Sequence, residues 1–259
     1  PVFTKAKTQL KRVVLCEGED QRVLHATQQI VSQKLAFPVL IGRPEVIERR
    51  IKELGLTIQP GKDFELVNNQ RDPRYREYWG EYYQSMKRKG ITEEMARRRV
   101  IGNTTLIGAL MVNRGDADAM ICGTFGRYRE HFDTIEQVIG YNNPEKVAGA
   151  MNALILPHGN IFITDTYVNA KPNAAQLAKI TEMATEDMRR FGIEPKVALM
   201  SNSNFGSIDN DTSRLMQDTL ELVRAAQPDL EVDGEMQGDV ALMEEMRHSI
   251  LPDSTLNGS

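Results

Sequence analysis

The sequence predicts an α/β protein built as two lobes, with mostly parallel sheets and helices on both faces. Short apolar runs alternate with amphipathic stretches along the whole chain. Strands that are separated by helices pair in parallel, because only a long crossover returns the chain to the same end of a sheet. Leu154–Leu156 and Ile161–Thr164 are the exception. Only Pro157–Asn160 separates them, and this spacing predicts an antiparallel hairpin.

The elements follow in order from their spacing. Arg12–Cys16 is a short apolar strand, and apolar residues recur at helical spacing in Asp20–Leu35, with Asp20 as the N-cap. Pro44 suits the first turn of a helix. The further strands expected are Phe37–Ile41, Phe64–Val67, Asp118–Cys122, Lys196–Met200 and Leu230–Val232. The further helices expected are Pro44–Leu54, Arg74–Lys89, Thr92–Arg99, Asn103–Asn113, Glu130–Ile139, Asn173–Phe191, Thr212–Ala226 and Val240–His248.

The alternation of strands and helices breaks near Tyr141–Ala150. This predicts a first lobe of residues 1–145 and a second lobe of residues 146–259. The chain begins at Pro1 without a methionine and stops at Ser259 after a polar turn, so it is expected to be part of a longer protein. The first lobe is then expected to lack a segment that returns to it from beyond Ser259.

Composition limits the classes of function. The 259 residues include 32 Lys and Arg against 36 Asp and Glu, a net charge of −4, which gives no general attraction to nucleic acid or to an anionic membrane. Two cysteines and no long apolar run argue against a disulfide scaffold, a CxxC metal site and a membrane span. Because no signal-peptide pattern is present, the sequence predicts a cytoplasmic protein.

Several common catalytic motifs are missing. No G-x-G-x-x-G follows a strand, and the P-loop, G-x-S-x-G and H-E-x-x-H patterns are absent as well. The chain is therefore not expected to carry a Rossmann dinucleotide site. The four histidines, His25, His131, His158 and His248, are dispersed, so no metal site is expected either.

A polar loop follows the expected strand Lys196–Met200. The carboxyl ends of strands in open α/β sheets bind ligands, and loop amides together with a helix N-terminus favour anions. The loop holds no Lys or Arg, so an anion would be bound by dipoles and hydroxyls. An ordinary βα loop with an Asx turn and an N-cap is an equally good interpretation. The candidate ligand-binding residues are Ser201, Asn202, Ser203, Asn204, Gly206 and Ser207.

Two further loops lie at expected strand ends. In Gly123–Arg129, Arg127 and Arg129 have the charge to bind a phosphate, and solvated loop charges are the alternative. Asp233–Asp239 carries paired carboxylates suited to acid–base work. The favoured interpretation of that segment is the start of a helix, where acidic residues complement the dipole. Thr124, Asn169 and Glu235 complete the set of candidate binding residues, and no catalytic residue is assigned.

Aromatic residues gather on one face of the expected helix Arg74–Lys89. Their spacing predicts a core or lobe-packing face, and a contact between subunits is the alternative. The residues are Tyr75, Tyr78, Trp79, Tyr82 and Tyr83.

Five blocks in order resemble the phosphate acetyltransferase family and span nearly the whole chain. They are C-E-G-E-D-Q-R at Cys16–Arg22, the block at Thr164–Ile180, M-S-N-S-N-F-G-S at Met200–Ser207, D-G-E-M-Q-G-D-V-A-L at Asp233–Leu242, and Pro252–Gly258. The resemblance implies two α/β lobes with coenzyme A and phosphate in the cleft between them, and a dimer.

The same comparison predicts a loss of transferase chemistry. The lysine of the family loop corresponds to Phe205, and two family arginines fall near Asp133 and Met86. Losing one preorganised donor at a developing oxyanion lowers the rate by about 10²–10³. The family's last catalytic Ser, Arg and Asp would lie beyond Ser259.

Other blocks are similar to the C-terminal phosphotransacetylase-like domain of bacterial hybrid NADP-dependent malic enzymes. They are G-T-F-G-R-Y-R-E-H-F, H-G-N-I-F-I-T-D-T-Y-V-N and S-N-S-N-F-G-S. This resemblance implies an oligomerising regulatory domain that binds acetyl-CoA or CoA as an effector. The effector would lie against Ser201–Ser207, with Thr124, Arg127 and Arg129 facing it. NADP and a divalent metal would belong to a malic-enzyme half that precedes Pro1. An active phosphate acetyltransferase and a purely structural oligomerisation module remain the alternatives.

Overall fold

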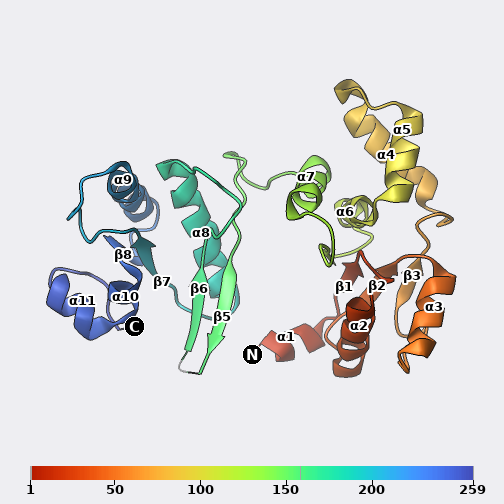
Figure 1. Cartoon of the computed structure of the whole chain (residues 1–259), viewed down its shortest axis with the longest axis horizontal. Helices are drawn as coiled ribbons and strands as arrows, with labels where there is room; N and C mark the ends of the chain where they lie inside the picture. The colour runs from red at the N-terminus through yellow and green to blue at the C-terminus, as the bar shows by residue number, and fades with distance from the viewer. Residues whose placement is uncertain (1, 158, 259) are drawn as a thin grey trace. The chain divides into compact units, whose positions relative to one another are not determined.

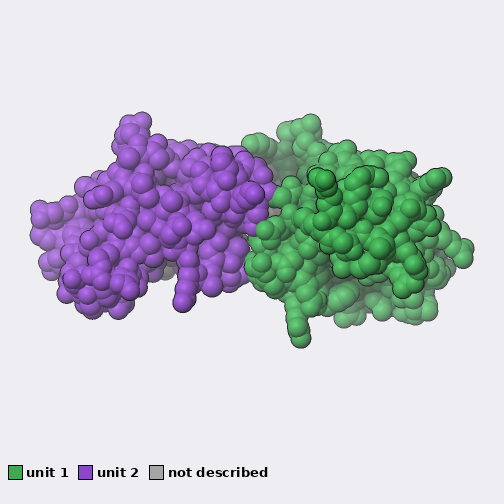
Figure 2. All heavy atoms as spheres, turned by 90° about the horizontal axis from the view of Figure 1, so that it is seen from above, with its two compact units in different colours: residues 1–140 green, residues 141–259 purple. Residues whose placement is uncertain are grey.

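The computed structural model describes residues 2–157 and 159–258, and they form two compact units. Unit 1 comprises residues 1–140 and unit 2 residues 141–259, and Figure 2 distinguishes them by colour. Both units contain parallel strands connected through helices, which confirms the predicted α/β class. Of the expected hairpin loop, His158 lies outside the described residues.

The described part of unit 1 is built on a four-stranded sheet in the order β3–β2–β1–β4. Figure 1 labels three of these strands, β1, β2 and β3. All three strand pairs are parallel, as the alternation predicts. The strands are β1 Arg12–Leu15, β2 Phe37–Ile41, β3 Glu65–Val67 and β4 Ala119–Ile121. The helices are α1 Val2–Thr8, α2 Gln21–Gln33, α3 Pro44–Glu53, α4 Tyr75–Met86, the 3-10 turn η1 Lys87–Lys89, α5 Glu93–Gly102, α6 Thr104–Arg114 and α7 Tyr128–Val138.

Two cores cover the two faces of this sheet, because successive side chains of a strand point to opposite sides. Leu15 and Leu40 pack with apolar residues of α2 and α3. Val14 and Val39, their neighbours in the same strands, pack with residues of α4, α5 and α6 instead. Unit 1 therefore has helices on both faces of its sheet, as predicted.

The aromatic face of α4 belongs to the second of these cores. Tyr78 and Tyr82 are buried in it, and Tyr75, Trp79 and Tyr83 pack against its edge. The guanidinium of Arg97 lies 4.3 Å from the centre of the Trp79 ring. The structure favours the core interpretation of the aromatic stripe over a subunit contact.

In unit 2 the predicted hairpin is confirmed. Strands β5 Asn152–Leu156 and β6 Gly159–Ile163 pair antiparallel, and β7 Lys196–Met200 and β8 Glu231–Met236 pair in parallel. The helices are α8 Ala174–Arg190, α9 Asp211–Ala226, α10 Gly238–Leu242 and α11 Glu244–Ile250. One core joins β7 and β8 to α8 and α9, and a second joins them to α10, α11 and Leu256. Within residues 2–157 and 159–258, every helix is too short or too polar to reach across a lipid bilayer.

Two expectations for the end of the chain are wrong. The strand expected at Leu230–Val232 continues to Met236, so Asp233 and Glu235 lie inside β8 and do not start a helix. Both carboxylates are buried, and their hydrogen bonds compensate for the loss of water. The single helix expected at Val240–His248 is two helices, because Met243 has extended backbone angles between α10 and α11.

Candidate functional site

The predicted polar loop of unit 2 lies against a β-bulge at the carboxyl end of β8. The parallel register passes from Leu199 opposite Gly234 to Met200 opposite Met236, so Glu235 is the extra residue. A bulge redirects the side chain at which it occurs. Here it brings the Glu235 carboxylate to the loop that follows β7.

Glu235 is fully buried and holds that loop in place. Its Oε1 accepts hydrogen bonds from Ser203 Oγ at 2.8 Å and from the Gly206 backbone amide at 2.7 Å. Its Oε2 lies 3.4 Å from Gln217 Nε2 of α9, and its backbone oxygen accepts from the Phe205 amide at 2.9 Å. One carboxylate therefore fixes the middle of the loop.

Most of the other polar groups of this loop form hydrogen bonds within the loop or to the neighbouring residue Gln237. Ser203 directs its hydroxyl proton to Glu235, so the Ser201 hydroxyl donates to Ser203 Oγ across 3.1 Å. Asn204 Oδ1 accepts from the Gln237 amide at 2.8 Å, and Ser207 Oγ accepts from the Asn204 amide at 3.1 Å. The loop is preorganised by these bonds, and α9 follows it with a capping box at Asn210.

Two of the six loop candidates have exposed side chains, Asn202 and Ser207. The side-chain amide of Asn202 makes no hydrogen bond to any described residue, while its backbone oxygen accepts from Gln237 Nε2 at 3.2 Å. Asn202 thus presents both a donor and an acceptor to solvent, which suits it to contact a polar ligand.

Asn169 stabilises a turn in the segment that follows β6. Its side-chain nitrogen donates to Asp165 Oδ2 at 2.8 Å and to the Ala148 backbone oxygen at 2.7 Å. Burial by itself raises the pKa of Asp165, but hydrogen bonds from the Ala150 and Asn169 amides outweigh it, and the pKa is lowered. The side-chain nitrogen of Asn169 is thus used in hydrogen bonds within unit 2.

In unit 1, Thr124 lies where the sequence predicts, at the end of β4, next to a residue that sequence reasoning missed. Glu17, buried at the end of β1, accepts from the Gly123 amide at 3.0 Å and from Thr124 Oγ1 at 3.3 Å. Its place directly after an apolar strand was the available signal. Glu17 positions the loop of unit 1 as Glu235 positions that of unit 2.

The two candidate arginines differ in their environment. Arg129 Nε lies 2.7 Å from Asp133 Oδ1, and its guanidinium lies 5.4 Å from the centre of the Phe132 ring. Arg127 is exposed at the N-cap of α7 and has no ion pair among the described residues. Arg127 therefore carries an uncompensated charge next to the Gly123–Gly126 turn.

The positions at which the resemblance expects cations are occupied by residues of other kinds. Phe205 is 39% exposed and adopts a left-handed backbone conformation, with φ at 46°. Asp133 is the acidic partner of Arg129, and Met86 is buried in the core beneath α4. None of the three supplies a positive charge.

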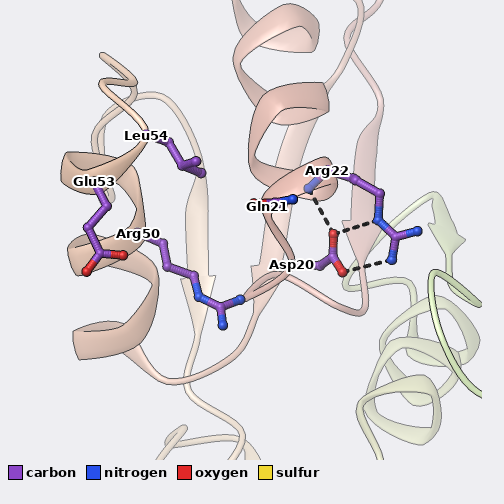
Figure 3. A pocket seen from close by; sticks show the side chains of 6 residues that line it. All are labelled: Asp20, Gln21, Arg22, Arg50, Glu53 and Leu54. Atoms are coloured by element: carbon purple, nitrogen blue, oxygen red, sulfur yellow. Dashed lines mark hydrogen bonds and ion pairs between the residues drawn. The ribbon is translucent and has the colours of Figure 1, made fainter.

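A pocket of about 420 Å³ lies in unit 1 (Figure 3), and one of its lining residues, Arg22, donates a hydrogen bond to the backbone oxygen of the candidate residue Thr124 at 3.0 Å. It is lined by Asp20, Gln21, Arg22, Arg50, Glu53 and Leu54. Asp20 and Arg22 bind each other, and the Arg22 hydrogen bond lowers the pKa of Asp20. Its acidic and basic groups are balanced, so it shows no preference for an anion. Among the described residues, no three His, Cys, Asp or Glu side chains are grouped to hold a metal ion.

The chain is similar in sequence to two kinds of protein. It is 60% identical over its full length to the NADP-dependent malic enzyme of Escherichia coli, of which it spans 34%. It is 31% identical over 99% of its length to the phosphate acetyltransferase of Corynebacterium glutamicum, of which it covers 77%. The chain thus spans about one third of the length of the malic enzymes it matches.

Comparison with solved structures shows a similar fold. A phosphotransacetylase from Streptococcus pyogenes matches the whole chain with a TM-score of 0.86 at 24% identity, covering 79% of that protein. The family model for phosphate acetyl/butaryl transferase matches residues 1–259. The chain therefore belongs to the phosphate acetyl/butaryl transferase family, and it corresponds to the region of that family found within malic enzymes.

Proposed function

We propose that the chain is the acetyl-CoA-binding regulatory domain of an NADP-dependent malic enzyme, without acetyl transfer of its own. One observation carries the proposal. Identity to a malic enzyme is 60% over the whole chain, against 31% to a phosphate acetyltransferase. The larger protein would oxidatively decarboxylate malate to pyruvate. NADP and a divalent metal would bind in the part of the malic enzyme that the chain does not span.

The proposed effector site uses the preorganised loop of unit 2. In unit 2, Asn202 and Ser207 expose polar groups, and Glu235 fixes the backbone that presents them. Unit 1 offers, by itself, a separate group that suits a phosphate, the unpaired charge of Arg127. A coupling free energy of about 1–3 kcal/mol between this site and the malic-enzyme part is sufficient for regulation.

The absence of transferase chemistry is proposed from three positions. Phe205, Asp133 and Met86 stand where the family resemblance expects cations, and each lost donor lowers the rate by about 10²–10³. The alternative is an active phosphate acetyltransferase. Formation of acetyl-CoA from acetyl phosphate and CoA at more than a trace rate would favour that alternative and contradict the proposal.

Replacing Asn202 with alanine is expected to weaken acetyl-CoA binding about fivefold, because one exposed hydrogen-bonding side chain contributes about 1 kcal/mol. Binding is measured as the rise in thermal unfolding midpoint with acetyl-CoA concentration. At 100-fold excess over Kd, ligand adds about 2.7 kcal/mol. Gln70→Ala, an exposed change in unit 1, is the control and is expected to leave Kd unchanged. An equal Kd for wild type and Asn202→Ala would exclude this loop from the site.

We also propose that the domain forms homo-oligomers through the β5–β6 hairpin. Leu154, Ile155 and Leu156 are 41%, 85% and 46% exposed, and residues 152–163 include no Asp, Glu, Lys or Arg. An isolated two-stranded ribbon is marginally stable in water, and apolar edge strands without charges readily pair with another chain. A second copy of the hairpin offers a matching apolar surface.

The substitution Ile155→Glu is expected to lower the mass in solution to that of a monomer, because it places a charge in the proposed apolar interface. Light scattering measures the mass. Leu222→Glu, a comparable change at an exposed leucine of α9, is expected to leave it unchanged. A monomeric wild type, or an unchanged mass in Ile155→Glu, would contradict this interface.

A further inference from the structure

The two cysteines of the chain directly follow the neighbouring parallel strands β1 and β4 of unit 1, at the carboxyl ends of these strands. Leu15 is paired in parallel register with Ile121, and the Cys16 amide donates to the Ile121 oxygen at 3.0 Å. Cys16 and Cys122 are the next residues along the two strands, and each thiol is the largest influence on the pKa of the other. They have different access to solvent, since Cys16 is buried and Cys122 is only half-buried.

The Cys16 thiol packs directly against Gly108 of helix α6. A Cβ atom at Gly108 would lie 2.6 Å from Cys16 Sγ, closer than any real contact, with Met120 and Val14 side chains at 3.3 and 3.4 Å. Glycine inside a helix is less stabilising than alanine, so its presence here calls for a packing reason. The absence of a side chain at Gly108 leaves room for the sulfur to lie against the helix and toward Cys122.

A histidine and a threonine connect to the accessible thiol. His131 Nε2 lies 2.9 Å from the Phe125 carbonyl oxygen, which only accepts, so Nε2 carries a proton. His131 Nδ1 lies 2.8 Å from Thr105 Oγ1, and Thr105 is near enough to Cys122 to lower the pKa of its thiol. The Cys122 proton can therefore pass to Thr105 while the Thr105 proton passes to Nδ1, leaving a thiolate and an imidazolium.

The surroundings favour this thiolate. The pKa of Cys122 falls to about 7, and the neighbouring Cys16 thiol is the largest cause. The charge of His131 and the nearby Thr105 hydroxyl also lower it, while burial raises it. The Cys122 thiol and burial together raise the pKa of Cys16. Glu17 is the acidic group that faces the pair, and its charge raises both values.

We propose that Cys122 and Cys16 are a peroxide-reactive pair in which Cys122 is the attacking thiolate and Cys16 the resolving thiol. The Cys122 sulfur attacks one peroxide oxygen, the O–O bond breaks, and the leaving hydroxide takes the imidazolium proton to form water. Cys16 sulfur then attacks the sulfenic acid of Cys122. The S–O bond breaks, a second water leaves with the Cys16 proton, and a disulfide forms. The two thiols lose two electrons, and the peroxide gains them.

The disulfide would link the loop that follows β1, which begins near Cys16, to the loop that follows β4, which begins near Cys122. Glu17 already connects these two loops by hydrogen bonds. Cys16 precedes Glu17, and Cys122 precedes Gly123 and Thr124, whose groups donate to the Glu17 carboxylate. Oxidation would therefore constrain the unit 1 loop that carries Arg127. This inference does not depend on acetyl-CoA being the ligand.

The test uses the full chain, reduced and then treated with hydrogen peroxide before peptide mass analysis. Wild type is expected to lose the mass of two hydrogen atoms and to yield a linked Cys16–Cys122 peptide. Cys16→Ser is expected to retain a sulfenic acid at Cys122 that dimedone captures. Cys122→Ser is expected to react at Cys16 at least tenfold more slowly. Overoxidation of Cys122 in wild type without a linked peptide, or equal rates in both serine variants, would overturn the assignment.

The relay is tested by the pH profile of Cys122 oxidation. Its midpoint is expected near 7 in wild type and at a higher pH in Thr105→Val and in His131→Gln, because each substitution removes one of the groups that lower the pKa of Cys122. Thr105→Ser keeps the hydroxyl and is expected to retain the wild-type midpoint. Far-ultraviolet circular dichroism establishes that each variant is folded. An unchanged midpoint in folded Thr105→Val would exclude Thr105 from the relay.

Discussion

Replacing Glu235 with alanine is expected to lower the free energy of unfolding by about 3 kcal/mol. The substitution leaves Ser203 Oγ and the Gly206 amide without their acceptor and opens a cavity, since Glu235 is fully buried. It is also expected to abolish acetyl-CoA binding, because the backbone of the unit 2 loop loses its fixed position. Denaturant unfolding measures the first effect and ligand-dependent thermal unfolding the second.

Two controls separate the loss of hydrogen bonds from a general effect of mutation. Glu235→Gln retains an oxygen acceptor of the same shape and is expected to destabilise by only about 1 kcal/mol. Glu221→Ala, an exposed change on α9, is expected to stay within about 0.5 kcal/mol of wild type. If Glu235→Ala behaved like Glu221→Ala, the proposed role of the buried carboxylate would be wrong.

Gly234→Ala is expected to destabilise the chain by about 3 kcal/mol or more. A Cβ at Gly234 would lie 2.6 Å from the Leu199 backbone oxygen and 2.9 Å from Leu199 Cβ, and β7 cannot move away without breaking its pairing with β8. The φ angle of 146° is also one that other residues rarely adopt. Thermal and denaturant unfolding measure the loss.

Replacing Gly80 with alanine is expected to raise the free energy of unfolding, the opposite of the effect at Gly234. Gly80 lies inside α4, where a Cβ would meet no atom within 4 Å, so alanine stabilises by about 0.5–1 kcal/mol through helix propensity. A Gly234→Ala variant as stable as Gly80→Ala would contradict the close approach of β7 and β8.

The sequence was informative wherever burial produces a regular pattern. Strands such as Phe37–Ile41 are apolar throughout because both faces of a parallel sheet are covered, and the short spacing at Pro157–Asn160 allowed only a hairpin. The pattern failed at β8, since Asp233 and Glu235 interrupt the apolar run although both are buried. Local sequence does not reveal a carboxylate whose partners, such as Ser203 and Thr255, are distant in the chain.

The sequence predicted which loops form the candidate site, but it did not predict which residues in them face solvent and which hold the loop in place. Spacing placed Ser201–Ser207 and Gly123–Arg129 at strand ends, where they lie. It could not separate Asn202, which is exposed, from Ser203, which is buried and used internally. The register that sets Cys16 beside Cys122, and the contact of His131 with Thr105, join residues from separate elements and emerge only in the folded chain.

We propose that this chain binds acetyl-CoA without transferring its acetyl group. Calorimetric titration of the 259-residue chain with acetyl-CoA is the most direct test. Saturable binding is expected, with no acetyl phosphate formed when inorganic phosphate is added to the titrated sample. The absence of any binding heat up to millimolar acetyl-CoA, or formation of acetyl phosphate, would contradict it.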